Sequence, residues 1–123
     1  MVVDTNIVIE HLRATNKFST TLYLIPENTD LFISSVSMYE LYMGAINQAG
    51  ENELKVVMEN IEVLNFTDDV AYKAAKLYNN LKKQNKLIEF RDIFIAATCI
   101  VNNLPLLTLN KKHFNRFEEL ALL

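Results

Sequence analysis

The feature that most constrains this chain is an alternation of short apolar runs with longer segments of helical periodicity. Residues 1–3, 31–34, 61–66 and 106–108 are short, mostly apolar runs of the kind found in buried strands. Between them, apolar residues return every three or four positions, as they do on one face of a helix. Strands that alternate with helices are typical of an α/β domain. We therefore expect an α/β fold with a mostly parallel central sheet.

The expected helices differ in how much of their surface is apolar. They are predicted over residues 5–12, 17–25, 35–49, 53–59, 68–86 and 88–101. Pro26 is expected to close the second helix and Gly50 the third, while Thr67 or Asp68 caps the fifth. The sixth is apolar almost all round, which indicates a buried central helix. The tail is expected to add a helical turn and an edge strand.

Length and composition define the class of molecule. The 123 residues predict a single domain over residues 1–123, and a content of 50% hydrophobic and 22% charged residues argues against disorder. The net charge of −3 counts against a nucleic-acid binder, unless several acids gather around bound cations. Without an apolar stretch of about 18 residues or a basic, apolar leader, we expect a cytoplasmic protein and no membrane contact.

Two kinds of reactive centre have little support in the sequence. The lone Cys99 lies in an apolar run, so we interpret it as a buried small hydrophobe that forms no internal disulfide. His11 and His113 lack the partner spacing of a zinc site or a catalytic triad, and His113 is interpreted as structural. A Gly-rich phosphate loop is absent as well.

Asp4 and the segment Thr108-Leu109-Asn110 each follow a predicted strand directly. Open parallel sheets bind their ligands at the carboxyl ends of the strands, so these side chains stand where a functional site is expected. Asp and Asn are also common N-cap and turn residues. The sequence leaves both interpretations open for each position.

Asp92 lies on the apolar helix predicted over residues 88–101. Its neighbours one turn away are Ile88, Ile95 and Ala96. A carboxylate on an apolar face is costly unless it is paired, hydrogen-bonded or bound to a metal. The alternative is an acid that complements the helix dipole or pairs with Arg91.

Glu40 has two interpretations that depend on where its helix begins. Ser37 and Glu40 have the spacing of a capping box, which would account for Glu40 fully. If the helix begins at Ser34 or Ser35 instead, Glu40 lies in its second turn and projects over the end of the preceding strand. The sequence does not decide between the two.

Taken together, these positions place three carboxylates and one carboxamide around one edge of the sheet. Hard oxygen ligands of this kind suit Mg²⁺ or Mn²⁺. Such ions, often in pairs, activate a water molecule and stabilise the charge that builds up on a phosphoryl group. The sequence therefore indicates a divalent-metal site with phosphoryl chemistry.

Four motifs appear in order along essentially the whole chain: Val3-Asp4-Thr5-Asn6-Ile7, the turn Ser34 to Ser37 before Glu40-Leu41, the segment 88–97 around Asp92, and Thr108-Leu109-Asn110 before His113-Phe114. This order and spacing resemble the PIN-domain family, in particular the small VapC-type toxins of prokaryotic toxin–antitoxin pairs. The resemblance implies a three-layer α/β/α sandwich and a divalent-metal-dependent endoribonuclease.

The resemblance also implies roles for individual residues and partners. The catalytic, metal-binding acids would be Asp4, Glu40 and Asp92, the fourth metal ligand Asn110, and supporting or phosphate contacts Thr108 and Asn6. Members of the family usually form homodimers and are inhibited by an antitoxin whose tail enters the site. We therefore expect Mg²⁺ or Mn²⁺ as cofactor, RNA as substrate, a cognate antitoxin and a homodimer.

Three functional hypotheses remain at this point. The leading one is the ribonuclease toxin of a type II toxin–antitoxin pair. The second is a PIN-domain nuclease for housekeeping RNA processing, and the third is a non-catalytic binding module that keeps the fold. The basic side chains that flank the site in sequence would contact RNA phosphates or simply be solvated: Arg13, Lys17, Lys111, Lys112 and Arg116.

Overall fold

A computed structural model describes residues 1–86 and 89–123 of the chain. Its described part contains one four-stranded sheet, in the order β3-β2-β1-β4. The strands are β1 (Val2–Val3), β2 (Leu31–Ser34), β3 (Ile61–Leu64) and β4 (Leu106–Leu107), and all neighbouring pairs are parallel. The chain moves outward from β1 to β3 and then returns to place β4 on the other side of β1. This reversal of strand order lies between β1 and β4.

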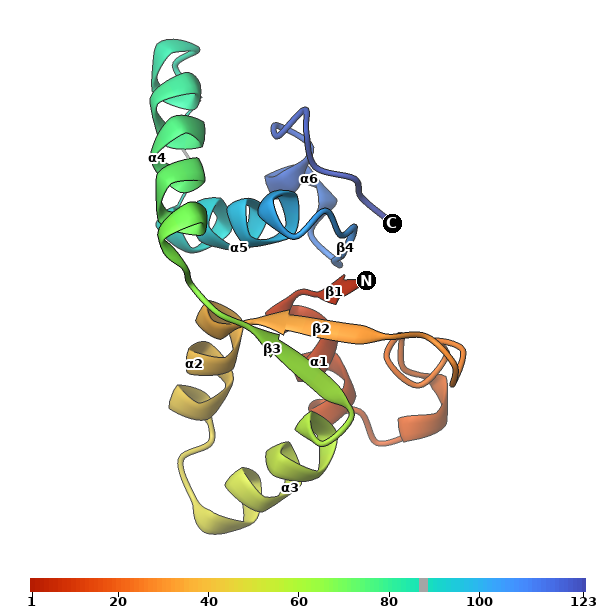
Figure 1. The fold of residues 1–123 in the computed structure, drawn as a ribbon. Coiled ribbons are helices and arrows are strands. Elements are labelled where there is room, and N and C mark those ends of the chain that lie inside the picture. Colours follow the sequence, from red (N-terminus) through yellow and green to blue (C-terminus); the bar gives the residue numbers. More distant parts are fainter. Residues whose placement is uncertain (87–88) are drawn as a thin grey trace.

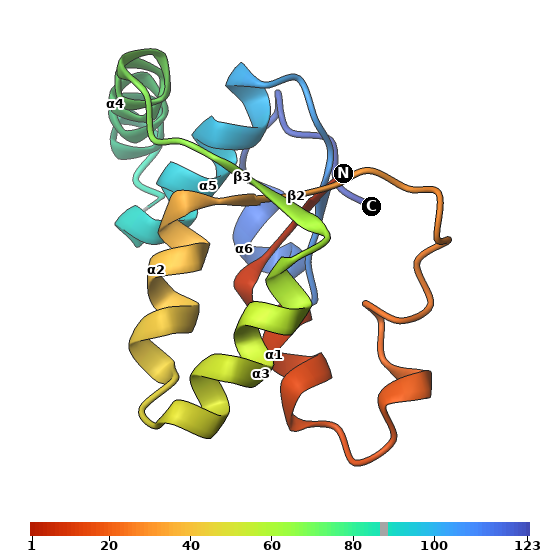
Figure 2. The same cartoon turned by 60° about the horizontal axis from the view of Figure 1, so that its bottom comes forward.

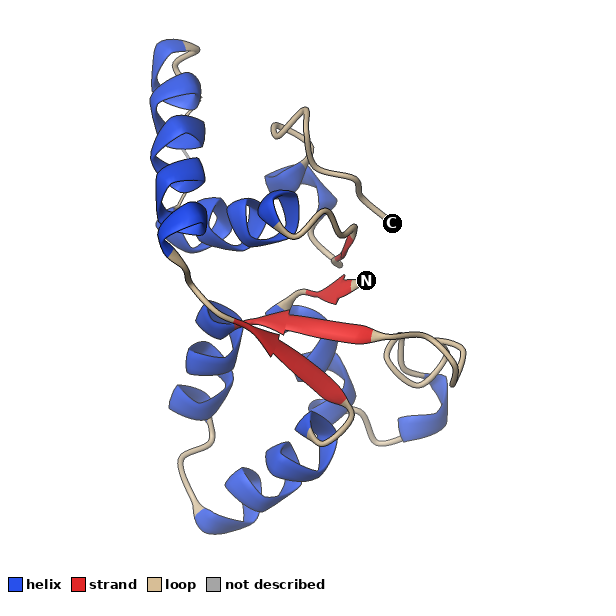
Figure 3. Cartoon of the chain, viewed as in Figure 1, coloured by secondary structure: helices blue, strands red, loops and turns tan. Residues whose placement is uncertain are grey.

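Helices cover both faces of the sheet, as Figures 1 and 3 show. One face is covered by α1 (Thr5–Arg13), α2 (Ser35–Gly44) and α3 (Gln48–Met58), which lie together below the strands in Figure 1 and can be followed again in Figure 2. The other face is covered by α4 (Asp68–Lys83), α5 (Phe90–Val101) and α6 (Lys111–Phe114). These layers confirm the expected α/β/α sandwich with a parallel sheet.

Two separate hydrophobic cores hold the layers together. Val3 and Ile33 pack with α1, α2 and α3 in one core, whereas Val2 and Leu106 pack with α4, α5 and α6 in the other. All four side chains are fully buried. Val2 and Val3 enter opposite cores because successive side chains of a strand point to opposite faces of the sheet. The two valines of β1 therefore fix the direction in which the next residue, Asp4, leaves the sheet.

The segment expected to form a helix over residues 17–25 does not do so. It contains only a short 3-10 helix, η1 (Lys17–Ser19), followed by turns. The backbone N–H of Thr21 donates to the Glu10 carboxylate at 2.7 Å, and the hydroxyl of Thr20 lies 2.7 Å from His11 Nδ1. The Glu10 side chain of α1 therefore takes the Thr21 N–H, which a second helix would have paired with one of its own carbonyl oxygens.

The single helix expected over residues 35–49 is in fact two helices. After α2 ends at Gly44, Asn47 caps a new helix by accepting a hydrogen bond from the Gly50 N–H at 2.8 Å. Gly50 therefore lies in the first turn of α3 and does not terminate a helix. The same α3 covers the helix expected over residues 53–59 as far as Met58. The error arose because an Asn side chain can capture a backbone N–H and start a helix where periodicity alone continues one.

Most other local predictions are confirmed. Thr67 caps α4 by accepting from the Val70 N–H at 3.2 Å, and Val70 and Leu77 are buried on the expected face of that helix. The tail adds the short α6, as expected, but in place of the expected edge strand the described residues form an isolated parallel bridge from Leu122 to Leu106. The expected start of the central helix, at residue 88, lies outside the described residues. In the described part of the chain, no helix has the length and apolar character needed to cross a membrane.

Candidate active site

Asp4 stands where β1 ends and α1 begins, with its side chain 2% exposed. It is the N-cap of α1, since Oδ1 accepts a hydrogen bond from the Thr5 N–H at 2.8 Å. The other carboxylate oxygen, Oδ2, accepts from the Thr108 hydroxyl at 2.8 Å. Asp4 thus caps a helix and also faces the neighbouring strand end, so the two sequence interpretations describe the same side chain.

Glu40 lies in the second turn of α2 because this helix begins at Ser35. Its N-cap is Ser34, whose hydroxyl accepts from the Ser37 N–H at 3.0 Å. This start excludes the capping box of Ser37 and Glu40. The Glu40 carboxylate projects toward α1, where Oε1 accepts from the Thr5 hydroxyl at 2.8 Å. The second interpretation of Glu40 is therefore the one that the structure supports.

Asp92 lies in the first turn of α5 and its side chain is 3% exposed. One of its oxygens accepts a hydrogen bond from Arg91 Nη1, and the other lies 3.3 Å from His113 Nδ1. The apolar face that carries Asp92 packs into the core, as its spacing predicted. The pairing with Arg91, which the sequence offered as an alternative to function, is present as well.

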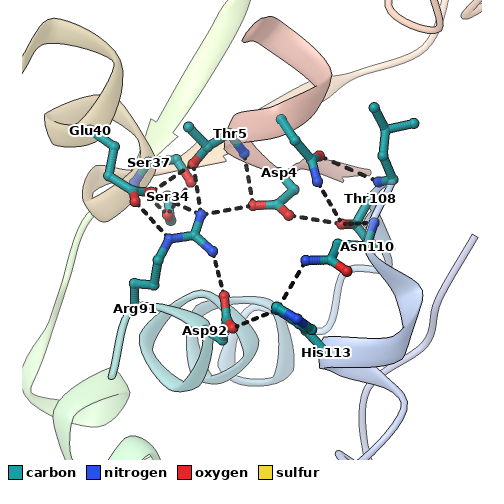
Figure 4. Close-up of polar contacts among 12 residues, drawn as sticks. Asp4, Thr5, Ser34, Ser37, Glu40, Arg91, Asp92, Thr108, Asn110 and His113 are labelled. Atoms are coloured by element: carbon teal, nitrogen blue, oxygen red, sulfur yellow. Dashed lines mark hydrogen bonds and ion pairs between the residues drawn. The ribbon is translucent and has the colours of Figure 1, made fainter. Parts of the chain in front are cut away.

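Arg91 occupies the centre of the cluster (Figure 4). Its Nε and Nη2 donate to the two oxygens of Glu40 at 2.6 and 2.9 Å. Nη2 also reaches the Asp4 carboxylate at 3.4 Å, and Nη1 donates to Asp92. A single guanidinium therefore bridges acids from three separate elements of the fold. The sequence had suggested only the local pair with Asp92.

Thr108 and Asn6 connect the two strand ends on either side of the strand-order reversal. The Thr108 side chain, which is buried, accepts from Asn6 Nδ2 at 3.4 Å and from the Asn110 N–H at 3.0 Å. The Asn6 side chain accepts in turn from the Leu109 N–H at 3.3 Å. This network holds the loop after β4 against the first turn of α1 and orients the Asp4 carboxylate.

Asn110 lies at the rim of the cluster rather than among the acids. Its Nδ2 is 2.9 Å from His113 Nδ1, the same nitrogen that lies near Asp92. Although Asn110 is the N-cap of α6 by position, its side chain makes no capping hydrogen bond. Its amide therefore approaches the acids only through His113, which the sequence interpretation had placed among structural residues.

The electrostatics of the three acids differ with their surroundings. Burial opposes ionisation of Glu40, but hydrogen bonds from Arg91 and Thr5 outweigh it and hold the pKa of Glu40 below its ordinary value. Burial raises the pKa of Asp92, and Arg91 and His113 offset this only in part. Burial would also lower the pKa of Arg91, but its hydrogen bonds and ion pairs, those to Glu40 foremost, raise it overall, so the guanidinium stays charged.

The donor chemistry of the cluster fits Mg²⁺ or Mn²⁺, since its carboxylates are hard oxygen donors at a sheet edge. The arrangement is closed around Arg91, however. Within residues 1–86 and 89–123, no three His, Cys, Asp or Glu side chains are grouped so that they could hold one metal ion. The acids instead surround the planar fork of the guanidinium. A metal ion would fit the donors present here only after the guanidinium has moved and the carboxylates have drawn closer together.

Comparison with known proteins connects this geometry to a family. The sequence model of the PIN domain matches residues 1–120. The chain belongs to the PIN-domain family. Two curated relatives are Ribonuclease VapC of Rickettsia bellii, 35% identical over 100% of this chain and 94% of its own length, and Ribonuclease VapC1 of Methanocaldococcus jannaschii, 30% identical over 99% and 84%.

The fold of this PIN domain is shared with solved VapC-type complexes. The structure of VapBC-1 from nontypeable Haemophilus influenzae superposes with a TM-score of 0.84 at 28% identity, over 99% of this chain and 95% of that one. The similarity therefore extends over the whole sandwich, including the sheet edge that carries Asp4 and Glu40.

Several residues of the PIN-domain site were not singled out by sequence reasoning. Thr5 binds both Glu40 and Arg91, and Arg91 was noted only as a neighbour of Asp92. The adjacency of Arg91 and Asp92 at a helix start was the one available signal. For Lys17 the sequence left open an RNA contact or a solvated charge, and in the structure it donates to the His11 and Leu12 carbonyl oxygens at the end of α1.

The remaining reactive candidate of the PIN domain, Cys99, is fully buried in α5. Burial raises the pKa of its thiol to about 12, so the thiolate that a nucleophile requires is scarce near neutral pH. The interpretation of Cys99 as a small hydrophobe is therefore consistent with its position.

Proposed function

We propose that this PIN domain is a divalent-metal-dependent endoribonuclease and the toxin of a type II toxin–antitoxin pair. Its catalytic centre would be Asp4, Glu40 and Asp92, with Mg²⁺ or Mn²⁺ as cofactor. The observation that carries this proposal is the meeting of three carboxylates, from the β1–α1 junction, α2 and α5, around one cationic group at the carboxyl edge of the sheet. Relatives named Ribonuclease VapC support the reaction.

The chain supplies fixed and oriented oxygen donors. The Asp4 carboxylate is held by the Thr5 N–H and the Thr108 hydroxyl, and Glu40 is held by the Thr5 hydroxyl. Neutral donors of this kind keep a carboxylate in place without cancelling its charge. A divalent cation bound by these acids would polarise a water molecule and neutralise charge on the scissile phosphate.

Thr108, Asn6 and Asn110 belong to the proposed site in supporting roles. Thr108 and Asn6 orient Asp4 and the loop after β4, where they would also stand near an RNA phosphate bound at the sheet edge. Asn110 is proposed as a fourth oxygen donor, since its amide contacts the histidine that lies against Asp92. To serve in that role, the amide has to turn from His113 toward the acids.

The proposed partners follow from the same relatives. The matched structure from Haemophilus influenzae is that of a VapBC-1 protein, and we propose a cognate antitoxin for this chain, encoded by a small neighbouring gene. We further propose that residues 1–123 act as one domain, in the cytoplasm and as a homodimer. A solution mass of twice the 14.2 kDa of one chain would test the dimer.

The test is cleavage of a mixed tRNA and mRNA pool by protein purified free of any partner, with Mn²⁺, Mg²⁺ or EDTA. The informative variant is Asp92→Asn, and its matched control is Asp69→Asn, because Asp69 is an exposed acid in the first turn of α4. We expect metal-dependent cleavage that Asp92→Asn reduces by at least about a hundredfold, since even residues behind metal ligands account for 10- to 100-fold. Asp69→Asn should cleave like wild type.

Two results would contradict the proposal. Cleavage that persists unchanged in Asp92→Asn would place the active centre elsewhere. Folded wild-type protein that cleaves none of these RNAs with either metal would favour a non-catalytic PIN-fold binding module.

A further inference from the structure

We propose that Arg91 is an internal counter-cation of the acid cluster, which a divalent metal must displace before it can bind. The inference rests on the proposed metal site and adds a role for a residue of this chain. Arg91 would keep the metal-free site closed and lower the affinity of the site for metal. It would thereby set the metal concentration at which the proposed nuclease becomes competent.

The guanidinium of Arg91 and a metal ion would use the same carboxylate oxygens. Arg91 Nη2 reaches Asp4 Oδ1 at 3.4 Å and Nη1 bonds to Asp92 Oδ1, while Glu40 is bonded through both of its oxygens. In the described residues no acid triple is grouped tightly enough to hold a metal. A metal ion shared by these acids therefore requires that the fork leave at least Asp4 and Asp92 and that the carboxylates then draw closer together.

Arg91 is freer to move than the buried aspartates that it contacts. Asp4 and Asp92 are the less mobile partners, because their side chains are 2% and 3% exposed and Asp4 is anchored by Thr5 and Thr108. Arg91 has a side chain that is 28% exposed and a long flexible stem. The cation can therefore withdraw, and the carboxylates must then draw together, because as they stand no acid triple of the described residues is grouped tightly enough to hold a metal.

The structure offers space into which the Arg91 side chain can move. An open, mostly apolar groove beside the cluster is lined by Ser35, Val36, Tyr39, Glu40, Met43, Arg91 and Phe94. The aliphatic stem of Arg91 can lie along such a surface while its charged head faces water. Withdrawal into this groove would leave Glu40 within reach but release the two buried aspartates.

The negative charge of the acid cluster also favours replacement of Arg91 by a divalent ion. Two buried carboxylates and the partly buried Glu40 are costly without a compensating cation. Arg91 offers one positive charge to this cluster and a divalent ion offers two. The ion can therefore replace Arg91 and neutralise more of the negative charge of the carboxylates. Without metal, Arg91 should account for much of the stability of this edge of the sheet.

The test compares Mn²⁺ binding by wild type, Arg91→Gln and Arg91→Lys, measured by calorimetry or by the electron paramagnetic resonance signal of free Mn²⁺. Lys112→Gln is the matched control, because it removes one positive charge from an exposed position on α6. We expect Arg91→Gln to bind Mn²⁺ on the order of tenfold more tightly, which corresponds to about 1.4 kcal/mol. Lys112→Gln should change the affinity much less, and Arg91→Lys should lie between wild type and Arg91→Gln.

A second measurement uses the wild-type protein and does not depend on the fold of a variant. The chain has only three arginines, Arg13, Arg91 and Arg116, so their Nε–H resonances can be assigned and followed by NMR. Addition of Mg²⁺ should shift the Arg91 resonance and increase its exchange with water as the bond to Glu40 loosens. The Arg13 resonance, from the exposed end of α1, should not change.

The outcomes separate this inference from the proposed function. Equal Mn²⁺ affinity of wild type and Arg91→Gln, with binding lost in Asp92→Asn, would keep the metal site and overturn the role of Arg91. Weaker binding by folded Arg91→Gln, or an Arg91 resonance that ignores saturating Mg²⁺, would overturn it as well. If neither wild type nor Arg91→Gln binds Mn²⁺, the metal site itself is wrong and the inference falls with it.

Discussion

At the scale of single residues, each acid of the cluster has more than one task. Asp4 caps α1 and also accepts from Thr108. Asp92 lies at the start of α5, pairs with Arg91 and approaches His113. A structural role therefore does not argue against a functional one at these positions. The sequence presents the two roles as alternatives because it does not show which side chains meet in the fold.

The shifted pKa of Glu40 predicts how it contributes to stability as the pH changes. Its pKa in the folded protein is lowered, so its contribution is fully present above the pKa of the unfolded chain, about 4.3, and is lost as the pH falls through the folded value. We expect metal-free wild type to lose unfolding free energy below about pH 4 more steeply than Glu40→Gln does. Urea denaturation across a pH series measures both slopes.

Glu62→Gln, which removes an exposed carboxylate from β3, controls for the loss of one negative charge. Parallel acid slopes for wild type and Glu40→Gln would show that Arg91 and Thr5 do not favour the charged form of Glu40, contrary to their contacts in the structure.

At the scale of the elements, the parts that sequence predicted best are those fixed by burial. Strand positions and the buried face of α4 follow from the spacing of apolar residues, because each such residue must enter one of the two cores. The break between α2 and α3 was missed because it depends on a side chain, that of Asn47, taking the Gly50 N–H. A cap contributes only about 1 kcal/mol to stability. It does not alter the spacing of apolar residues, so periodicity alone does not reveal the break between the helices.

Ser34 and Thr67 are N-caps of similar geometry, so substituting each in turn distinguishes a loss of stability from a loss of function. Ser34 and Thr67 each accept a hydrogen bond from the backbone N–H three residues later, at 3.0 and 3.2 Å, but only Ser34 begins the helix that carries Glu40. Ser34→Ala and Thr67→Ala should each lower the free energy of unfolding by about 1 kcal/mol. Only Ser34→Ala should also slow RNA cleavage, by roughly tenfold, since indirect support of a ligand is worth about 10- to 100-fold.

Denaturant titrations and initial cleavage rates of both variants at the same RNA concentration measure these effects. Equal cleavage rates in Ser34→Ala and Thr67→Ala would mean that the start of α2 does not control the position of Glu40.

At the scale of the whole molecule, the strand order β3-β2-β1-β4 determines which residues meet. Because the order reverses between β1 and β4, Asp4 and Thr108 lie side by side although 104 positions separate them. The rule for parallel sheets predicted this edge from sequence. It did not predict the central place of Arg91, since the reach of a long side chain from α5 to α2 depends on how the two helices pack across the sheet edge.

The most direct test of the central claim is anomalous diffraction from crystals of the wild-type protein grown with Mn²⁺. We expect a manganese peak among the carboxylates of Asp4, Glu40 and Asp92, with the Arg91 guanidinium withdrawn from Asp4 and Asp92. A guanidinium that still bridges the three acids at saturating Mn²⁺, with manganese bound elsewhere or not at all, would contradict it.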